Sequence, residues 1–307
     1  ICRVNYEVRN FNVDEAKEFI AQTGAPIVVK ADGLAAGKGV VVAMTIEEAN
    51  AAVEDMLRGN RFGDAGSTVV IEEFMEGEEA SLLAFVDGKT VVPMIASQDH
   101  KRIFDGDKGP NTGGMGTYAP APVLTDTLRD EAMKTILEPM VAAMQKEGMP
   151  YVGCLYAGLM ITPQGPKVVE FNARFGDPET QVVLPLLDSD LGQIMMACAT
   201  GTLTADMVKW KDSSAACVIL ASKGYPETSS KGDMIHGDIK QHDTTIVFHS
   251  GTKLIGDEYV TNGGRVLGVV GLGKDLRTAL DRAYERIEHI DFEGMQYRTD
   301  IGAKAFK

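Results

Sequence analysis

Two lysines flank a glycine-rich turn near the start of the chain. The turn, residues 31–39, connects two apolar, strand-like runs, with Lys30 before it and Lys38 within it. Glycines let backbone amides approach an anion closely, and lysines supply positive charge. Lys30 ends an apolar run, where an unpaired ammonium is costly, so a bound anion is favoured over two surface lysines on a hairpin. The sequence predicts a phosphate clamp.

The spacing within this turn excludes a Walker P-loop. One residue too few separates Gly33 from Gly37 and Lys38, and Gly39 stands where a P-loop has Ser or Thr. A P-loop also opens a helix, whereas this turn leads into the valine run 40–42. We therefore expect a β-turn-β flap over a nucleotide.

A second group of polar residues lies near the middle of the chain. The period of two in a strand places Glu170, Asn172 and Arg174 on one face, with Phe171 and Phe175 on the other. Carboxylate and amide oxygens suit Mg²⁺, and a guanidinium grips phosphate oxygens. These residues predict a metal site on a phosphate chain. The alternative is a strand end with a solvated polar face.

Two further segments contain residue types that are suited to ligand binding. Residues 71–79 form a strand end whose backbone could contact an adenine edge, followed by a later acid for ribose hydroxyls; an acidic, solvated turn is the alternative. Residues 97–122 form a long polar stretch without periodicity, and stretches of that length often carry function. Its segments 99–102 and 109–116 combine cations with what we expect to be exposed amides. The alternative there is a flexible surface loop.

Alternating strands and helices position these groups. Asn12 and Glu15 form a capping box before a helix that Gly24 ends, and Thr45 with Glu48 caps a second helix. A long amphipathic helix over 128–144 is expected to be kinked or interrupted at Pro139. Two further helices are expected at 190–200 and 275–290. We expect strands at 68–72, 80–86, 90–95, 154–162, 167–171, 215–221, 245–249 and 265–270, with antiparallel pairing of the second and third.

The composition is that of a globular protein with an acidic surface. The 307 residues carry a formal charge of −14, which disfavours general binding to nucleic acid or to a membrane surface. The four cysteines, Cys2, Cys154, Cys198 and Cys217, have no CxxC spacing, so a thiolate metal site and a disulfide framework are both disfavoured. A reducing cytoplasm is the expected location. The first residue is not Met, and we expect a fragment of a longer protein.

Together, four segments resemble those of the phosphoribosylamine–glycine ligase family of the ATP-grasp superfamily. The resemblance spans nearly the whole chain, including Gly224-Tyr225-Pro226. The segments are Val29-Lys30-Ala31-Asp32-Gly33-Leu34-Ala35-Ala36-Gly37-Lys38-Gly39-Val40, Ser97-Gln98-Asp99-His100-Lys101-Arg102, Pro110-Asn111-Thr112-Gly113-Gly114-Met115-Gly116 and Glu170-Phe171-Asn172-Ala173-Arg174-Phe175-Gly176-Asp177-Pro178-Glu179-Thr180-Gln181.

The resemblance implies a fold and a domain division. The fold is α+β, with two ATP-grasp subdomains that clasp ATP, followed by a small α+β domain. We place the lid subdomain at residues 1–79, the large subdomain with the metal and substrate site at 80–206, and the C-terminal domain at 207–307. Family members begin with a separate dinucleotide-fold-like domain, and because this sequence opens just before the clamp region, we expect that domain to be missing from it.

The resemblance also implies roles for particular residues. Lys38 and Arg174 would be catalytic, with Arg174 on the phosphoryl group in flight. Glu170 and Asn172 would bind Mg²⁺ or Mn²⁺. ATP would contact Lys30, Gly37, Lys38, Gly39, Glu72, Glu73, Phe74, Met75 and Glu79, the last through its ribose. The glycine and phosphoribosylamine pocket would include Asp99, Lys101, Asn111, Thr112, Gly113, Gly114, Met115, Gly116, Arg174 and Gly176.

The implied activity is ATP-dependent ligation of glycine to 5-phosphoribosylamine through glycyl phosphate, in purine biosynthesis, by a monomer or homodimer. Two alternatives remain: another ATP-grasp carboxylate-amine ligase, or a truncated nucleotide-binding module without turnover. The sequence departs from many ATP-grasp enzymes in one respect. They carry another metal-binding acid on the strand before Glu170, where this chain reads Leu155-Tyr156-Ala157-Gly158-Leu159-Met160, so the ligand set is either lean or completed elsewhere.

Overall fold

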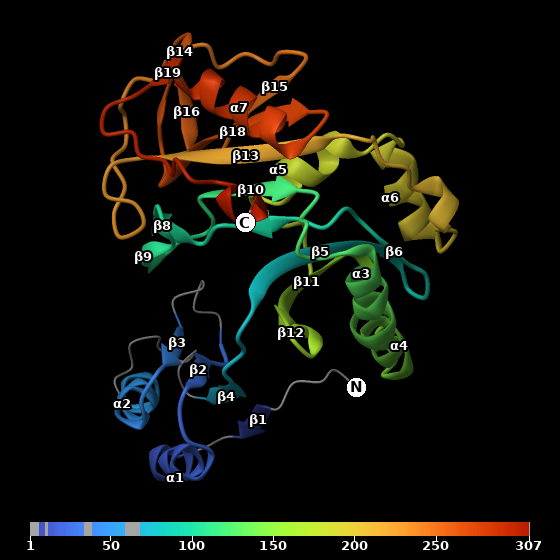
Figure 1. The fold of residues 1–307 in the computed structure, drawn as a ribbon, viewed down its shortest axis with the longest axis vertical. Helices are drawn as coiled ribbons and strands as arrows, with labels where there is room; N and C mark the ends of the chain where they lie inside the picture. The colour runs from blue at the N-terminus through green and yellow to red at the C-terminus, as the bar shows by residue number, and fades with distance from the viewer. Residues whose placement is uncertain (1–5, 10–11, 34–38, 59–67, 307) are drawn as a thin grey trace. The chain divides into compact units, whose positions relative to one another are not determined.

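The computed structural model describes residues 6–9, 12–33, 39–58 and 68–306. The chain divides into two compact units, Arg3–Gly77 and a larger one that contains Glu78–Lys307. The smaller unit has one sheet and the larger unit several, and each unit has its own apolar core (Figure 1).

The smaller unit is one antiparallel sheet with two helices. The expected capping box is confirmed, because Asn12 Oδ1 accepts from the Glu15 N–H at 2.9 Å and Glu15 Oε2 accepts from the Asn12 N–H at 3.0 Å. Thr45 likewise caps the second helix, and both helices share one apolar core with the sheet. The strand order is β1 (Tyr6–Arg9), β4 (Val69–Glu73), β2 (Ile27–Ala31) and β3 (Val40–Ala43); the helices are α1 (Val13–Thr23) and α2 (Ile46–Leu57).

The first sheet of the larger unit carries the predicted metal strand. It is antiparallel throughout, as the sequence predicts for residues 80–95, and its apolar residues include the fully buried Leu83 and Phe85. Helix α6 (Leu191–Thr200) packs against two of its strands. The strand order is β12 (Gly165–Asn172), β11 (Val152–Thr162), β5 (Glu78–Asp87) and β6 (Val91–Pro93).

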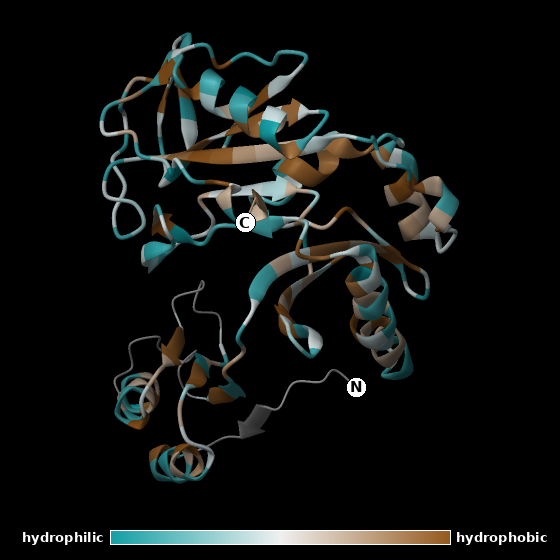
Figure 2. Cartoon of the chain, viewed as in Figure 1, coloured by the Kyte–Doolittle hydropathy of each residue, from teal (hydrophilic) through white to brown (hydrophobic). Residues whose placement is uncertain are grey.

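The second large sheet joins segments that are far apart in sequence. All eight residues of its central strand β13 are buried, and the strand is largely brown in Figure 2. Helix α7 (Leu276–Ile287) packs on β13 and β18. The sheet therefore contains strands from both sides of residue 206, where we expect a domain boundary. Its order is β15 (Thr245–His249), β18 (Arg265–Gly273), β13 (Ser214–Ala221), β10 (Gly116–Ala119) and β7 (Gln98–Asp99).

The expectation of an irregular stretch over residues 97–122 is wrong. The stretch contains β7 and β10, and between them an antiparallel hairpin of β8 (Arg102–Phe104) and β9 (Lys108–Asn111). All four residues of β10 are buried, so the alternation that reveals a half-exposed strand is missing. The other strands here have only two to four residues, too few for a periodic pattern.

The helix around Pro139 is interrupted, as predicted. It runs as α3 (Asp126–Ala132), a π-helical turn η2 (Met133–Leu137) and α4 (Glu138–Lys146), with the proline in the first turn of α4. Proline lacks the N–H that continues an α-helical ladder, which explains the change at that point. The remaining elements are α5 (Thr180–Val183), η3 (Leu184–Leu186), η4 (Ala205–Met207), β14 (His236–Gly237), β16 (Thr252–Ile255), β17 (Glu258–Thr261), β19 (Ile290–Asp291) and η5 (Ala303–Phe306).

Within the described ranges, no helix combines the length and the apolar character that crossing a bilayer requires. Three cysteines lie in those ranges, Cys154, Cys198 and Cys217, and each is a buried free thiol.

Candidate active site

Four residues that the sequence analysis singled out line one small pocket of the larger unit. Glu79 comes from β5, Asp99 from β7, Lys101 from just beyond β7, and Glu170 from β12. The strands bring together residues up to 91 positions apart, from 79 to 170. The remaining lining residues are Ala80, Ser81, Tyr156, Gly158, Leu159 and Val169.

The pocket holds an ammonium among carboxylates. Lys101 Nζ lies 3.9 Å from Glu79 Oε2. Burial lowers the pKa of Lys101, but the carboxylates of Glu79 and Asp99 outweigh burial and raise this pKa above its usual value. Burial, and then the neighbouring Glu179 carboxylate, raise the pKa of Asp99 well above its usual value. Lys101 is thus a permanent cation at neutral pH, beside an acid whose ionised form is disfavoured.

A buried polar triad, two of whose members line the pocket, was not predicted from the sequence. Glu179 Oε1 accepts hydrogen bonds from Tyr156 at 2.9 Å and Ser81 at 3.1 Å, and the two hydroxyl oxygens are 2.9 Å apart. All three residues are at most 4% exposed. Glu179 lies in the Glu170–Gln181 segment that carries the family resemblance, where an acid directly after proline was the available signal. Ser81 and Tyr156 sit in largely apolar strands and gave none.

Glu170 and Asn172 lie on one face of β12, as predicted. The Asn172 amide nitrogen donates to Glu170 Oε1 at 3.1 Å, which leaves its amide oxygen beside the carboxylate. Gly158 of β11 pairs with Glu170, and a Cβ there would stand 3.3 Å from Glu170 Cγ. The lack of a side chain at 158 therefore gives the carboxylate room.

These two residues fit a divalent cation that also binds phosphate oxygens. Glu170 is exposed and offers hard oxygen ligands together with Asn172, as Mg²⁺ prefers when phosphates complete its coordination shell. Among the described residues, no cluster of three or more His, Cys, Asp or Glu side chains is spaced to enclose a metal. A cation here would therefore take its other ligands from the substrate and water.

Arg174 and Gly176 follow the end of β12. Arg174 is exposed, and its Nη1 donates to the Phe175 carbonyl oxygen at 2.9 Å. Gly176 is buried, and a Cβ at this position would collide with Glu179 Oε2. The guanidinium is thus accessible, whereas Gly176 serves the packing of the buried acid.

The glycine-rich turn at 113–116 does not present the free amides that we expected. The N–H of Gly113 donates to the Tyr225 hydroxyl at 3.0 Å, that of Gly114 to Thr112 Oγ1 at 2.9 Å and that of Met115 to the His100 carbonyl at 2.8 Å. The expectation is wrong because the fold itself uses these donors.

The turn instead contacts the pocket through packing and through Thr112. A Cβ on Gly114 would lie 2.7 Å from Asp99 Oδ1, so the turn packs directly on that carboxylate. Thr112 donates from its N–H and its hydroxyl to the Lys101 carbonyl, at 2.7 and 2.8 Å. Asn111 is exposed at the end of β9 and is not among the residues that line the pocket.

In the smaller unit, Lys30 has a protein partner. Its Nζ lies 2.5 Å from Glu72 Oε2, a residue of the neighbouring strand β4. The inference of a bound anion from an unpaired ammonium is therefore wrong, because a carboxylate already balances the charge. Whether Lys30 also contacts ATP stays a prediction.

The other predicted nucleotide contacts of this unit are placed as follows. The expected strands before and after the glycine turn are confirmed as β2 and β3, which pair in antiparallel register from Ile27 with Ala43 to Lys30 with Val40. Gly39 is buried, and its carbonyl accepts from the Ala31 N–H at 2.8 Å. Glu72 and Glu73 end β4, and Phe74 and Met75 follow it, all half-buried. Gly37 and Lys38 lie outside the described residues.

Known proteins share both the fold and the sequence pattern. The family model for the ATP-grasp (A) domain of phosphoribosylglycinamide synthetase matches residues 1–180, and the model for its C domain matches residues 215–304. The crystal structure of phosphoribosylamine–glycine ligase from Thermotoga maritima is 35% identical, with a TM-score of 0.88, over 98% of this chain and 75% of that one. The biotin carboxylase domain of Hydrogenobacter thermophilus 2-oxoglutarate carboxylase, 15% identical, shares the fold with a TM-score of 0.75 over 97% of this chain and 64% of that one.

The fold and the pocket thus define an ATP-grasp protein, as the sequence predicted. Curated relatives narrow the class. The phosphoribosylamine–glycine ligase of Neisseria meningitidis serogroup A is 54% identical over 297 residues, 96% of this chain and 70% of that protein. That of Halalkalibacterium halodurans is 53% identical over 301 residues, 98% of this chain and 70% of that protein. The chain belongs to the phosphoribosylamine–glycine ligase family, which confirms the resemblance seen in the sequence.

Proposed function

We propose that this chain catalyses the ATP- and Mg²⁺-dependent ligation of glycine to 5-phosphoribosylamine, giving glycinamide ribonucleotide, ADP and phosphate. Membership in the family and the activity printed in the names of its relatives support this reaction. The structural observation that carries it is the pocket that combines Lys101 and Asp99 with Glu170. It offers a fixed cation for a carboxylate substrate beside a metal-binding acid.

The first step suits these residues because it requires no general base. The carboxylate of glycine is already a nucleophile, and its attack on the γ-phosphate of ATP forms glycyl phosphate and releases ADP. Lys101 remains protonated in the pocket and can hold the attacking carboxylate. Arg174 and Lys38 would offset charge on the phosphoryl group. Glu170 and Asn172 would hold the divalent cation, which when bound neutralises phosphate charge.

In the second step, the amine of phosphoribosylamine attacks the carbonyl carbon of glycyl phosphate. The C–N bond forms, the C–O bond to phosphate breaks, and the amine loses a proton. We assign Asp99, Asn111, Thr112, Gly176 and the turn 113–116 to the pocket for these substrates. We assign Lys30, Gly37, Gly39, segment 72–75 and Glu79 to ATP. Catalysis then rests on positioning and electrostatics.

The remaining assignments are coarser. Mn²⁺ is the alternative to Mg²⁺, because both accept the oxygen ligands that Glu170 and Asn172 offer. We propose a monomer or homodimer in the cytoplasm that acts on small molecules, and the charge of −14 argues against nucleic acid or an anionic membrane surface as partners.

ADP release tests the proposal directly. The protein is incubated with ATP, Mg²⁺, glycine and freshly made phosphoribosylamine, and each substrate is omitted in turn. Sustained ADP release that requires both glycine and phosphoribosylamine is the expected result. Release driven by a different carboxylate would replace this reaction with that of another ATP-grasp ligase. Tight ATP binding without turnover would instead identify a nucleotide-binding module.

A further inference from the structure

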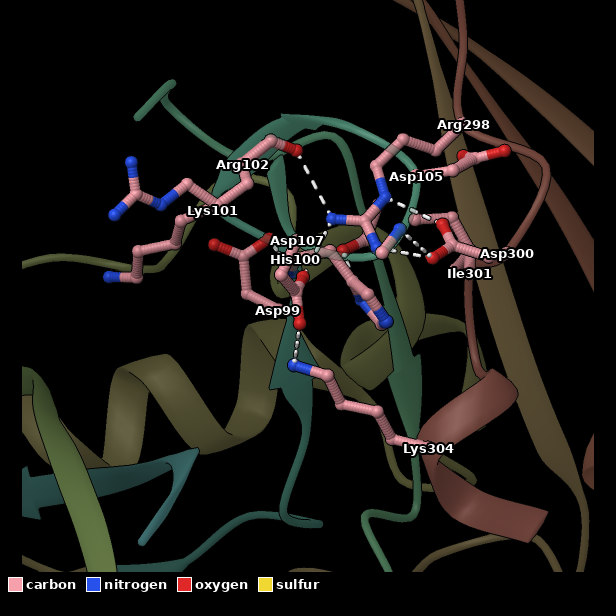
Figure 3. A network of polar contacts seen from close by, with 12 residues as sticks. Asp99, His100, Lys101, Arg102, Asp105, Asp107, Arg298, Asp300, Ile301 and Lys304 are labelled. Carbon is pink, nitrogen blue, oxygen red and sulfur yellow. Dashed lines mark hydrogen bonds and ion pairs between the residues drawn. The ribbon is translucent and has the colours of Figure 1, made fainter. Parts of the chain in front are cut away.

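An arginine near the C-terminal end is buried in the larger unit and is fully engaged in polar contacts. Arg298 is 1% exposed. Its Nε and Nη2 donate to the two carboxylate oxygens of Asp300, at 2.7 and 2.8 Å, and its Nη1 donates to Asp107 Oδ1 at 2.8 Å and to the Arg102 carbonyl at 3.1 Å (Figure 3). The last two contacts reach the β8–β9 hairpin, more than 190 residues earlier in the chain.

Neighbouring C-terminal residues hold the same hairpin turn. Asp105 accepts from the Thr299 N–H at 2.9 Å and from the Thr299 hydroxyl. Asp300 Oδ2 accepts from the Gly106 N–H at 2.8 Å. Lys304 Nζ lies 2.5 Å from Asp107 Oδ2. All three turn residues between β8 and β9 are thus bound by segment 298–304. Figure 3 shows Arg298, Asp300 and Lys304 of that segment near Asp105 and Asp107.

His100 makes a second connection between the C-terminal segment and the pocket. His100 is 1% exposed and stands between Asp99 and Lys101 in the chain. Its Nδ1 lies 3.2 Å from the Gly116 carbonyl, which can only accept, so Nδ1 carries the hydrogen. Its Nε2 then accepts from the Gly302 N–H at 3.4 Å. Burial, and after it the Arg298 and Lys304 cations, lower the pKa of His100 to about 4, so the ring stays neutral.

A short series of hydrogen bonds connects Arg298 with residues of the substrate pocket. Arg298 binds the carbonyl of Arg102, the residue after Lys101. The Lys101 carbonyl in turn accepts both hydrogen bonds from Thr112. Lys101 directly precedes β8 and Asn111 ends β9, so both strands adjoin residues assigned to substrate at the end of the hairpin opposite the turn. Segment 298–304 binds the turn itself.

Such a cluster is costly as a source of stability alone. Buried ions lose hydration, and an apolar core of equal volume often stabilises a fold as well or better. The charged groups instead fix the geometry of the contact, because a bidentate guanidinium holds its partners in one plane.

We propose that Arg298 is a positioning residue for the ligase reaction: through the β8–β9 hairpin it fixes Asp99, Lys101 and Thr112 in the geometry that glycine and phosphoribosylamine require. The inference rests on the proposed function. It gives segment 298–304 a positioning role in the reaction, although none of its residues lines the pocket.

Three variants test the inference. Arg298→Met removes the guanidinium and keeps an apolar side chain of similar length. Asp107→Asn weakens the same connection from the hairpin side, at a residue that is 35% exposed and so a lesser risk to folding. Arg277→Met is the matched control, because this exposed arginine of the same region stacks on Phe306, 4.4 Å from the ring centroid, and not on the hairpin.

Steady-state kinetics are measured at a temperature where circular dichroism shows every variant folded. We expect Arg298→Met to lower kcat/KM for glycine by about tenfold or more, with the KM for ATP within about twofold of wild type. Asp107→Asn should act in the same direction, and the double variant should lose less than the product of the two single losses. Arg277→Met should behave as wild type. Unchanged glycine kinetics in folded Arg298→Met, or equal losses for ATP and glycine, would overturn the inference.

Hydrogen–deuterium exchange separates this inference from the proposed function. In Arg298→Met we expect faster exchange in peptides covering 99–116 and no change in peptides of β12. If the wild-type protein shows no glycine-dependent ADP release, the proposed reaction fails, and the exchange result still decides whether the segment orders the hairpin. Unchanged exchange over 99–116 would overturn the inference on its own.

Discussion

Tyr156 donates a hydrogen bond to Oε1 of Glu179 over 2.9 Å, although the two residues are buried and come from different elements. A carboxylate in such a place is stable only when hydroxyls or amides replace its lost hydration. Ser81 is the second donor to the same oxygen. Tyr156 and Ser81 together therefore hold the buried carboxyl group of Glu179 in place.

Tyr156→Phe is expected to lower the free energy of unfolding by about 2 kcal/mol, because the buried carboxylate loses one of its hydroxyl donors. Tyr151→Phe is the matched control: its hydroxyl donates to the Cys154 carbonyl, an uncharged acceptor, at 2.6 Å, and about 1 kcal/mol is expected. Urea denaturation followed by circular dichroism measures both. A loss in Tyr156→Phe no larger than in the control would show that Glu179 does not depend on this donor.

Asp99→Asn is expected to stabilise the protein while it impairs the reaction. Because the folded-state pKa of Asp99 is raised, stability is lost progressively as the pH rises from the unfolded value of 3.8 to the folded value, and an amide, which does not titrate, removes this loss. We expect Tm at pH 7 to rise by roughly 2 °C or more, and kcat/KM for glycine to fall by about tenfold. The gain in Tm over wild type should shrink as the pH falls toward 4. A lower Tm at pH 7 would contradict this assignment.

Asp87→Asn is the opposite case and the control for Asp99. Burial raises the pKa of Asp87, but backbone N–H donors of Thr90, Lys89 and Leu203 outweigh it and lower the pKa. A depressed carboxyl pKa contributes stability above the unfolded value of 3.8, and the contribution is lost as the pH falls through the folded value. Asp87→Asn should therefore lower the unfolding free energy at pH 7 by about 1 to 3 kcal/mol, with a difference that vanishes in acid.

The double variant Glu170→Ala with Asn172→Ala is expected to remove turnover and leave the fold intact. Both residues are at the solvated end of β12, so their loss creates no buried cavity. The single variant Glu170→Gln should raise the Mg²⁺ concentration needed for half-maximal activity by about tenfold, because an amide is a weaker ligand than a carboxylate. Glu147→Gln, at an exposed acid that ends α4, should leave the Mg²⁺ dependence unchanged. Wild-type rates in the folded double variant would refute the metal assignment.

The parts of the fold that depend on residues close together in sequence were predictable. The cap formed by Asn12 and Glu15 follows from a spacing of three residues, and the shared face of Glu170 and Asn172 follows from the period of a strand. Strand β10 was missed because both of its faces are buried, so its sequence does not alternate.

The contacts that depend on register or on distant segments were not predictable. The partner of Lys30 is decided by how β2 and β4 align, which the composition of the two strands does not specify. Glu179 meets Ser81 across 98 positions, and Arg298 meets Asp107 across 191. Sequence patterns indicate which residues are buried or periodic; they do not indicate which buried acid meets which donor.

Gly114→Ala is expected to disturb the pocket through a contact that only glycine permits. Gly114 has a φ of +116°, and a Cβ there would lie 2.5 Å from Pro178 Cδ and 2.7 Å from Asp99 Oδ1, so the substitution combines backbone strain with a clash on the substrate acid. Gly148→Ala isolates the strain, because its φ is +75° and nothing lies within 4 Å of the added Cβ. The control should lose about 1 kcal/mol of unfolding free energy and keep its kinetics. Gly114→Ala should lose more, by about 1 to 3 kcal/mol, and should also raise KM for glycine. Equal stability losses and unchanged KM in the two variants would show that the turn does not pack on Asp99.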